Sequence, residues 1–600
     1  MLGLLPGAGG TQRLPKVVGI QKALEMATTG KNIRPDAAKR MGLVDIVADP
    51  AALMDAALLA ARGLADGSLK RATPKWKSSL MTKVLEGNPV GRAVLFSQAE
   101  KMIQKKAGPH YPAPLAIAKC IKTGADQGHA AGSKLEREEF GKLGMTTVSE
   151  GLRGLFFAQT ESKKNSYGKP AHAVKTVGVL GAGLMGAGIA QVSAEAGLNV
   201  VLKDTTSAGL GRGEAQIAKN LDAKVKRRRM TQSVRNQTLS RVTGLCDELS
   251  PASGIAASGH DEHSAAATAA HFRNVDVMIE AVFEDLDVKH KVIKAVEPLL
   301  PEHAVFATNT SALPIADVAK AAKRPERVVG MHYFSPVDKM QLMELIPHAG
   351  TDKDALAAAY DTALKQGRTV VVSKDVPGFI VNRALAPAMA SSVLLLEEGV
   401  SPEKIAAVQK KAGYPVDGIT LMDQVGMDVA NNVFKFMSAN LPERMAGPTS
   451  GLLQDLVDAG LLGNKAGKGF YSYVKGKRQG SQVTPEATAI LQKHVRSGAP
   501  GAELGDEEVL ERLYLPFINE MMFNVQDGIV QNARAADLAS VFGTGYLPYT
   551  GGAISHAERV LGLGKVLDKL DFYTDKVGPQ FQPPQLLRDL VKSGGSFYKQ

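Results

Sequence analysis

The stretch that decides the fold is KTVGVLGAGLMGAGIAQ, residues 175–191. It predicts a strand, a glycine turn and a helix, because an apolar run leads into Gly181, Gly183 and Gly186 and then into small helix-forming residues. Gly181 allows a tight turn, Gly183 lets the backbone approach a pyrophosphate, and Gly186 lets the helix pack close to the strand. The free N–H groups at the start of the helix then face the phosphates. The pattern therefore predicts a dinucleotide-binding βαβ unit.

An acidic residue ends the next apolar run. LNVVLKD, residues 198–204, finishes at Asp204, about 20 residues after the glycines, where a carboxylate accepts hydrogen bonds from the ribose hydroxyls of the adenosine. Because a carboxylate at this place repels a 2′-phosphate, the sequence predicts NAD as the cofactor. The alternative is a glycine-rich turn in some other α/β fold. Such a turn does not require a strand before it, a helix after it and an acid at this spacing, so the nucleotide interpretation is favoured.

Length and composition narrow the class of protein. The 600 residues predict roughly three to five domains. Lysine and arginine number 72 against 60 acidic residues, which permits nucleic acid, an anionic membrane surface or phosphorylated substrates as partners. Because the charge is spread along the chain without interleaved aromatics, we do not expect nucleic acid. Cys120 and Cys246 are the only cysteines, so a disulfide framework is excluded and a reducing compartment is expected.

Alternating β-rich and helical runs organise the middle of the chain. From Val174 to about residue 370 the β-rich runs are TVGVLG, NVVLKD, VDVMIEAV, AVFATNTS, RVVGMHYF, QLMELI and TVVVSKD. This order predicts an α/β Rossmann-type domain with a mostly parallel sheet. The segment before the linker KKNSYGKPAH, 163–172, is predicted to be mostly helical, and so is the chain after Pro377.

Two further segments stand out. PGFIVNRALAPAMASSVLLLEEGV leads to GYPVDG, and LPFINEMMFNVQDGIV leads to GYLPYTGG, which predicts a degenerate duplication of a helical unit. Residues 247–271 are rich in alanine and serine and are predicted to be a mobile surface insertion. The insertion contains a cluster that could suggest a metal site: His260, Asp261, Glu262 and His263. Because no rigid framework is expected around them, a solvated loop is the favoured interpretation.

His332 and Glu344 are the candidates for acid–base chemistry. They lie twelve residues apart in GMHYFSPVDKMQLMELI, so two extended runs joined by a turn would bring an imidazole and a carboxylate together. Such a pair acts as a general base, although a histidine beside a glutamate is more often structural. Asn309 and Ser311 in TNTS, and Asn382 in FIVNR, favour the catalytic interpretation because they can donate hydrogen bonds to a polarised oxygen.

Several long motifs carry a resemblance. The glycine fingerprint, EAVFEDLDVK, TNTSALPI, GMHYFSPVDKMQLMELI, PGFIVNR and GLLGNKAGKGFYSY resemble the L-3-hydroxyacyl-CoA dehydrogenase family. GLLPGAGGTQRLP and AAKRMGLVD resemble the enoyl-CoA hydratase, or crotonase, family. Joined in this order, the two resemble the multifunctional fatty-acid β-oxidation proteins, and most nearly their mitochondrial trifunctional α subunits.

The resemblance implies an activity and a set of roles. The activity is NAD-dependent oxidation of an L-3-hydroxyacyl-CoA to the 3-ketoacyl-CoA. His332 matches the catalytic base and Glu344 its partner, and Ser311 and Asn382 match residues that polarise the substrate. The matches implied near the cofactor or the CoA are Glu284 and Lys289 at the nicotinamide ribose, and Lys224, Lys226, Arg227, Arg228, Arg229 and Ser335 at the CoA. For the basic run, a solvated helix face is an equally good interpretation.

The same resemblance implies the domain order. Residues 1–160 match the C-terminal part of a crotonase domain with a linker helix, 173–370 the NAD-binding domain, and 371–480 and 500–600 two copies of an all-α dehydrogenase C-terminal domain. The implied partners are an acyl-CoA substrate and a thiolase β subunit, with peripheral membrane association and a mitochondrial location.

One departure and two rival interpretations remain. The family's two hydratase glutamates lie upstream of the segment that matches MLGLLPGAGG, so we expect an N-terminally truncated chain without hydratase activity and with exposed apolar side chains on residues 1–60.

The rival interpretations are another NAD enzyme, such as a 6-phosphogluconate-type dehydrogenase with a lysine base, and a non-catalytic scaffold subunit. An assay for NADH formed from a 3-hydroxyacyl-CoA separates all three.

Overall fold

The computed structural model describes residues 2–70, 76, 80–247, 268–448, 451–501 and 503–599. The chain divides into two compact units, Met1–Phe156 and Phe157–Gln600. Residues 248–267 of the predicted insertion, including the histidine and acid cluster at 260–263, lie outside the described residues, so that prediction stays open.

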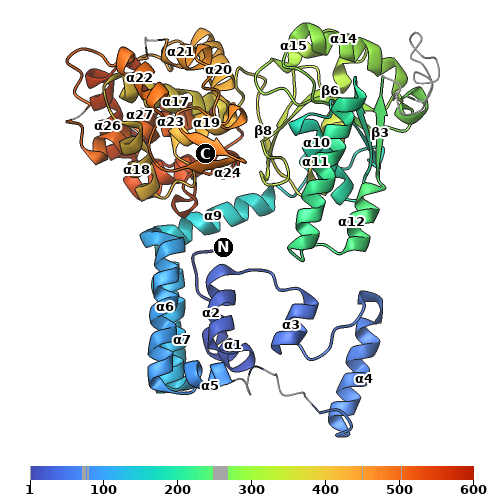
Figure 1. Ribbon diagram of the computed structural model, residues 1–600, viewed down its shortest axis with the longest axis vertical. Coiled ribbons are helices and arrows are strands. Elements are labelled where there is room, and N and C mark those ends of the chain that lie inside the picture. Colours follow the sequence, from blue (N-terminus) through green and yellow to red (C-terminus); the bar gives the residue numbers. More distant parts are fainter. Residues whose placement is uncertain are drawn as a thin grey trace. The chain divides into compact units, whose positions relative to one another are not determined.

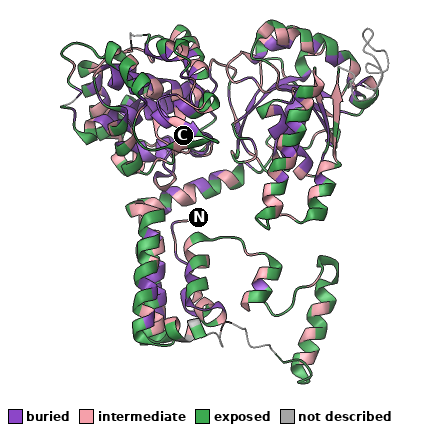
Figure 2. Cartoon of the chain, viewed as in Figure 1, coloured by how far each residue is buried: buried purple, intermediate pink, exposed green. Residues whose placement is uncertain are grey.

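The first unit is helical, as predicted (Figure 1). Its core is built from α1, α2, α6 and α7 around side chains such as Phe96, Ile117 and Cys120. No residue of α4 is buried (Figure 2). Its Leu53, Met54 and Leu59 are more than half exposed. The helices of this unit are α1 (Gly10–Val18), α2 (Ile20–Thr29), α3 (Pro35–Met41), α4 (Leu53–Ala65), α5 (Leu80–Glu86), α6 (Pro89–Ala107), α7 (Ala113–Gln127) and α8 (His129–Gly144). Helix α9 (Thr147–Glu161) spans the division between the units.

The second unit begins with an eight-stranded sheet in the order β3-β2-β1-β4-β5-β6-β7-β8. All neighbouring strands are parallel except β6 and β7, which are antiparallel. The strands are β1 (Thr176–Leu180), β2 (Asn199–Asp204), β3 (Val242–Cys246), β4 (Val277–Glu280), β5 (Val305–Thr308), β6 (Val328–Tyr333), β7 (Leu342–Ile346) and β8 (Thr369–Val372). The mostly parallel Rossmann-type sheet is therefore confirmed, and β3 is the strand that the apolar pattern missed.

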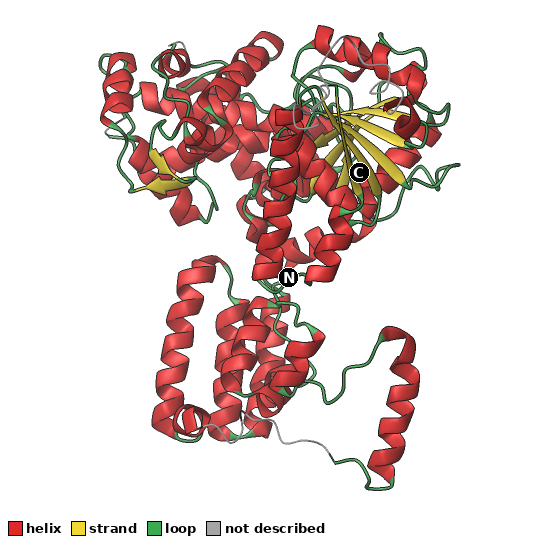
Figure 3. Cartoon of the chain, turned by 45° about the vertical axis from the view of Figure 1, so that its right-hand side comes forward, coloured by secondary structure: helices red, strands yellow, loops and turns green. Residues whose placement is uncertain are grey.

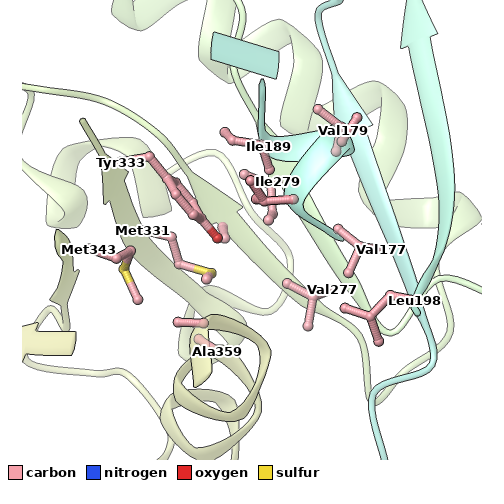
Figure 4. Close-up of a cluster of buried hydrophobic side chains, with 14 of the residues drawn as sticks. Val177, Val179, Ile189, Leu198, Val277, Ile279, Met331, Tyr333, Met343 and Ala359 are labelled. Carbon is pink, nitrogen blue, oxygen red and sulfur yellow. The ribbon is translucent and has the colours of Figure 1, made fainter. Parts of the chain in front are cut away.

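Two cores cover the two faces of this sheet. Alternate strand residues such as Val177 and Val179 pack with Ile189 and Ala359 on one face (Figure 4), because side chains of a strand alternate between faces. Met278 and others pack with α14 and α15 on the opposite face. The helices of this domain are α10 (Leu184–Glu195), α11 (Ser207–Lys226), α12 (Gln232–Leu239), α14 (Leu286–Val296), α15 (Ile315–Ala319) and α16 (Lys353–Lys365).

Helices dominate the rest of the unit, with one small hairpin that the all-helical expectation did not include (Figure 3). The two long helices α17 and α23 pack on each other, and Arg383 of α17 binds Glu520 of α23 at 2.8 Å. The elements are α17 (Val381–Glu397), α18 (Pro402–Ala412), α19 (Gly418–Val425), α20 (Met427–Asn440), α21 (Leu452–Asp458), β9 (Ser472–Val474), β10 (Lys477–Gln479), α22 (Pro485–His494), α23 (Asp506–Gln526), α24 (Ala533–Thr544), α25 (Ala553–Ser555), α26 (Leu563–Lys576) and α27 (Gln585–Ser593).

A buried aspartate ties α24 to α25. Asp537 accepts hydrogen bonds from the N–H groups of Ile554 (2.9 Å) and Ser555 (3.1 Å) and from the hydroxyl of Tyr598. Burial nevertheless raises the pKa of Asp537 to about 7. Burial also lowers the pKa of the neighbouring His556 to about 4. The native helical region therefore favours the neutral forms of both side chains near pH 5.

We expect Asp537→Asn to change how stability depends on pH. The raised pKa of Asp537 means that its contribution to stability is present below about pH 4 and is lost as the pH rises through about 7. The lowered pKa of His556 gives the opposite trend between about pH 4 and 6.5, because the unfolded imidazole binds the extra proton there.

Asparagine keeps a neutral hydrogen-bond acceptor at position 537 but does not titrate. The loss of stability with rising pH that Asp537 causes is therefore absent from the variant. The unfolding midpoint of the variant, relative to the unmodified chain, should rise between pH 4 and pH 7, as measured by differential scanning calorimetry. A constant difference across this range would contradict the assignment to Asp537.

Candidate functional site

The three glycines of the fingerprint occupy the places that their predicted roles require. Gly181 has φ +90°, and a Cβ there would lie 2.6 Å from the carbonyl oxygen of Ala281. A Cβ on Gly186 would lie 1.8 Å from the carbonyl oxygen of Gly181, so the helix approaches the turn more closely than any side chain permits. Gly183 caps α10 and has nothing within 4 Å of a Cβ position. A backbone without neighbours at this point is what the predicted approach of a pyrophosphate requires.

Asp204 is fixed beside this turn at the end of β2. Its Oδ2 accepts the N–H of Ala182 at 2.8 Å, and its Oδ1 accepts the N–H of Thr206 at 3.2 Å. The carboxylate therefore bridges the glycine turn and the loop after β2, at the switch point of the sheet where β1 lies between β2 and β4. Open α/β sheets bind ligands in this crevice.

His332 and Glu344 face each other across the antiparallel strands β6 and β7. They are register partners, and the Nδ1 of His332 lies 2.7 Å from the Oε2 of Glu344. Both side chains are buried. Since Nδ1–H donates to the carboxylate, Nε2 is the nitrogen that can take a proton. The predicted proximity of the two groups is confirmed.

The second oxygen of Glu344 holds the start of α17. Its Oε1 accepts the N–H groups of Val381 (2.9 Å) and Ile380 (3.3 Å). The next residue, Asn382, donates from Nδ2 to the carbonyl oxygen of Ser311 at 3.0 Å. Three sets of hydrogen bonds thus connect the four residues expected to do the chemistry: His332 to Glu344, Glu344 to the start of α17, and Asn382 to Ser311.

Glu284 holds the loop that carries Ser311. Its Oε1 accepts the N–H of Ser311 at 2.7 Å and the hydroxyl of Thr310 at 2.6 Å. Burial acts to raise the pKa of Glu284, but the ammonium of Lys289 and these hydrogen bonds outweigh it and lower that pKa below its usual value. The Glu284 side chain remains 40% exposed, so it can also accept a hydrogen bond from a ligand.

Lys289 lies behind Glu284 rather than at the surface of the site. It is 1% exposed, and its Nζ contacts both oxygens of Glu280 (2.9 and 3.0 Å) and Glu284 (3.2 Å). Glu280 also accepts the hydroxyl of Thr308 at 2.7 Å. Sequence reasoning missed Glu280, whose signal was an acid in the apolar run VMIE, nine residues before a lysine. Lys289 thus holds the carboxylates of Glu280 and Glu284 together.

The basic run lies at the end of α11. Lys224 is paired with Glu195, whereas Lys226 and Arg227 are exposed, as is Ser335 after β6. No hydrogen bond among the described residues joins these side chains to the His332–Glu344 pair. Their contact with CoA stays a prediction.

Within the described ranges, no group of three or more His, Cys, Asp or Glu side chains is placed to hold a metal ion. No helix in the described part of the chain is long and apolar enough to span a bilayer. Neither Cys120 nor Cys246 forms a disulfide bond.

Family models match most of the chain. Residues 176–257 and 253–376 match the 3-hydroxyacyl-CoA dehydrogenase NAD-binding domain, and 378–473 match the C-terminal domain of the same enzyme. Residues 1–109 match the enoyl-CoA hydratase/isomerase family. These matches confirm NAD as the cofactor of this fold and follow the domain order predicted from the motifs.

Curated relatives and solved structures agree with the family models. The chain is 39% identical to the fatty acid oxidation complex subunit alpha of Shewanella amazonensis, over all of this chain and 80% of that protein. The subunit of Idiomarina loihiensis is also 39% identical, with the same coverage. The structure of 3-hydroxybutyryl-CoA dehydrogenase from Escherichia coli covers 70% of this chain and all of its own, with a TM-score of 0.57 and 25% identity. Because these relatives are bacterial, the expected mitochondrial location is wrong.

Proposed function

This chain belongs to the family of fatty acid oxidation complex alpha subunits, and we propose that His332 and Glu344 are the base of its dehydrogenase reaction. The enzyme is an NAD-dependent 3-hydroxyacyl-CoA dehydrogenase of fatty-acid β-oxidation. The observation that carries the assignment of residues is the 2.7 Å contact between His332 Nδ1 and Glu344 Oε2, beside the loop with Ser311 and the start of α17 with Asn382.

The proton of the substrate hydroxyl goes to His332. When bound, NAD⁺ accepts the hydride that leaves C3. His332 Nε2 takes the hydroxyl proton as the C3–O bond becomes a carbonyl, so one hydride and one proton leave the substrate together. Glu344 keeps the proton on Nδ1 beforehand and stabilises the imidazolium that forms. Both groups are buried, and this strengthens their electrostatic interaction.

Two side chains are assigned to the developing carbonyl oxygen. Ser311 and Asn382 lie on segments that are fixed by Glu284 and by Glu344 respectively. The Ser311 hydroxyl donates to Glu284 Oε1 at 3.3 Å, and Asn382 Nδ2 donates to the Ser311 carbonyl at 3.0 Å. To stabilise the C3 oxygen, Ser311 would turn its hydroxyl from Glu284 to that oxygen, and Asn382 would use its second N–H. Asp204 and Gly183 are assigned to the adenosine ribose and the pyrophosphate of NAD.

The partners follow from the family. The substrate is an acyl-CoA, and a β subunit completes the complex that the relatives' name describes. We further propose that this β subunit is a thiolase, since a 3-ketoacyl-CoA is the substrate that thiolytic cleavage consumes, and that the complex binds membranes peripherally. We also propose the domain limits 1–160, 173–370, 371–480 and 500–600.

The test of the function is NADH formation from L-3-hydroxybutyryl-CoA and NAD⁺ by the purified chain. Activity that disappears in a His332→Ala variant supports the proposal. A chain that binds NAD but reduces none of it with any 3-hydroxyacyl-CoA would refute it and favour a scaffold role.

Replacing Asp204 with alanine should weaken NAD binding by about 1–2 kcal/mol, the scale of a lost hydrogen bond to a charged group. The same change removes the carboxylate that repels a 2′-phosphate, so the preference for NAD over NADP should narrow. Isothermal titration of both cofactors measures the two effects. Equal affinity of the unmodified chain for NADP and NAD would sink this prediction.

A further inference from the structure

A pocket of about 180 Å³ lies among α17, α19, α20, α23 and α24. Asn382, Leu385, Ala386 and Met389 all line it. These residues are spaced i, i+3, i+4 and i+7, so one face of α17 forms a wall. The wall begins at Asn382, the residue already assigned to the C3 oxygen. Asn382 is therefore shared by the pocket and the proposed catalytic site.

The pocket runs along α17 toward Ser392. Ten residues separate Asn382 from Ser392, and both line the pocket, which corresponds to about 15 Å of helix. At the far end Gln409 accepts the N–H of Gly418 at 2.7 Å, and Ser392 donates to a backbone carbonyl at 3.0 Å. The Oε1 of Gln409 and the hydroxyl of Ser392 are therefore already paired within the protein.

The remaining walls are mostly apolar. Phe517 and Tyr546 stack with their ring centroids 5.1 Å apart, and Leu421 of α19 lines the same pocket. Tyr546 is itself hydrogen-bonded to His556 at 2.6 Å, so its hydroxyl is not offered to a ligand. A long unbranched apolar group is the ligand that such a lining accepts.

We propose that this pocket receives the acyl chain of the substrate beyond C3, and that Met389 and Leu421 limit its length. The inference rests on the proposed function, because Asn382 provides the link to the reacting carbon. An extended chain advances roughly 1.3 Å per carbon, so a length of about 15 Å would fit about a dozen carbons. The volume is the tighter limit, because a cavity of about 150 Å³ holds a six-carbon benzene, so the pocket of about 180 Å³ holds roughly seven carbons beyond C3. Each buried methylene is worth about fourfold in affinity, so the pocket favours 3-hydroxyacyl chains of about ten carbons over those of four.

The test compares kcat/KM for 3-hydroxydecanoyl-CoA and 3-hydroxybutyryl-CoA. Met389 lies seven residues along α17 from Asn382, out of the ten that separate Asn382 from Ser392, so Met389→Trp fills about the last third of the pocket. The ratio of the two kcat/KM values should fall at least tenfold, with most of the change in KM for the long substrate. Val429→Trp is the matched control, since Val429 is 42% exposed on α20 and does not line the pocket. It should leave the ratio unaltered.

The outcomes are distinct. If the ratio in Met389→Trp equals that of the unmodified chain, the acyl chain lies elsewhere and the inference is overturned. If Met389→Trp loses activity toward both substrates, Leu421→Phe, a smaller insertion from the opposite wall, decides by the same ratio. If the unmodified chain oxidises neither substrate, the proposed function fails, and that result is separate from a failure of the pocket.

Discussion

His332→Ala is expected to lower kcat for 3-hydroxybutyryl-CoA oxidation by about 10²–10⁴-fold, the usual contribution of a positioned general base. The Kd for NAD should stay nearly unchanged, because the glycine turn and Asp204 are held by contacts that do not involve β6. Steady-state kinetics and titration of NAD measure the two quantities. Near-normal kcat would remove His332 from the mechanism.

Glu344→Gln tests the same pair without removing the imidazole. Because Oε1 of Glu344 accepts the N–H groups of Val381 and Ile380, the glutamine oxygen must stay on that side. Its NH₂ then faces His332 Nδ1 and donates to it, which moves the ring proton to Nε2. A ring in that tautomer cannot accept the hydroxyl proton. A comparable change in a Ser-His-Asp triad costs about 10⁴ in kcat, and we expect a loss of that order.

The control for both variants is Asp361→Asn, which alters a surface ion pair of α16 with Lys365. Its kcat should match that of the unmodified chain. If both Glu344→Gln and Asp361→Asn retained the kcat of the unmodified chain, the carboxylate of Glu344 would have only a packing role.

Lys289→Met should destabilise the nucleotide-binding domain by about 3–5 kcal/mol, because it leaves Glu280 buried without its counter-ion. The Glu280 side chain is 0% exposed, and Lys289 is its ion-pair partner at 2.9 Å. For a domain of this size the loss corresponds to a fall of roughly 10 °C in the unfolding midpoint. Calorimetry of the full chain measures it.

A second variant separates charge from packing. The double variant Glu280→Gln, Lys289→Met removes both charges, and it should recover a large part of the lost stability, because a buried pair replaced by neutral groups is often nearly neutral in free energy. A midpoint in Lys289→Met within about 2 °C of the unmodified chain would mean that water or a rearrangement solvates Glu280 in the native state.

The nucleotide turn and the His332–Glu344 pair were predictable because their signals are local. The glycine spacing encodes backbone conformations, and a histidine and a glutamate on either side of one turn come together when the two runs pair as a hairpin. The register partners His332 and Glu344 are that case. The acid at 204 was predictable for the same reason, since it ends the strand that follows the glycine unit.

Other features depended on burial that no local pattern shows. Strand β3 lies at the sheet edge with mostly half-exposed residues, so its sequence VTGLC lacks the continuous apolar run of the inner strands. Lys289 has the sequence of an exposed helical lysine and is in fact buried against two carboxylates. Whether Lys289 is exposed or buried depends on how α14 packs on the sheet, which its local sequence does not show.

The hydrogen bonds from Ile380 and Val381 to Glu344 limit where this gene can be recombined with those of its relatives. A chimera whose crossover falls between β7 and α17 would combine the His332–Glu344 pair of one parent with the first turn of α17 from the other. Such a chimera is active only if the two segments fit together where Glu344 meets α17. A crossover in the linker 163–172 leaves the joint intact. Successful recombinants between distant parents should therefore inherit residues 328–397 as one block.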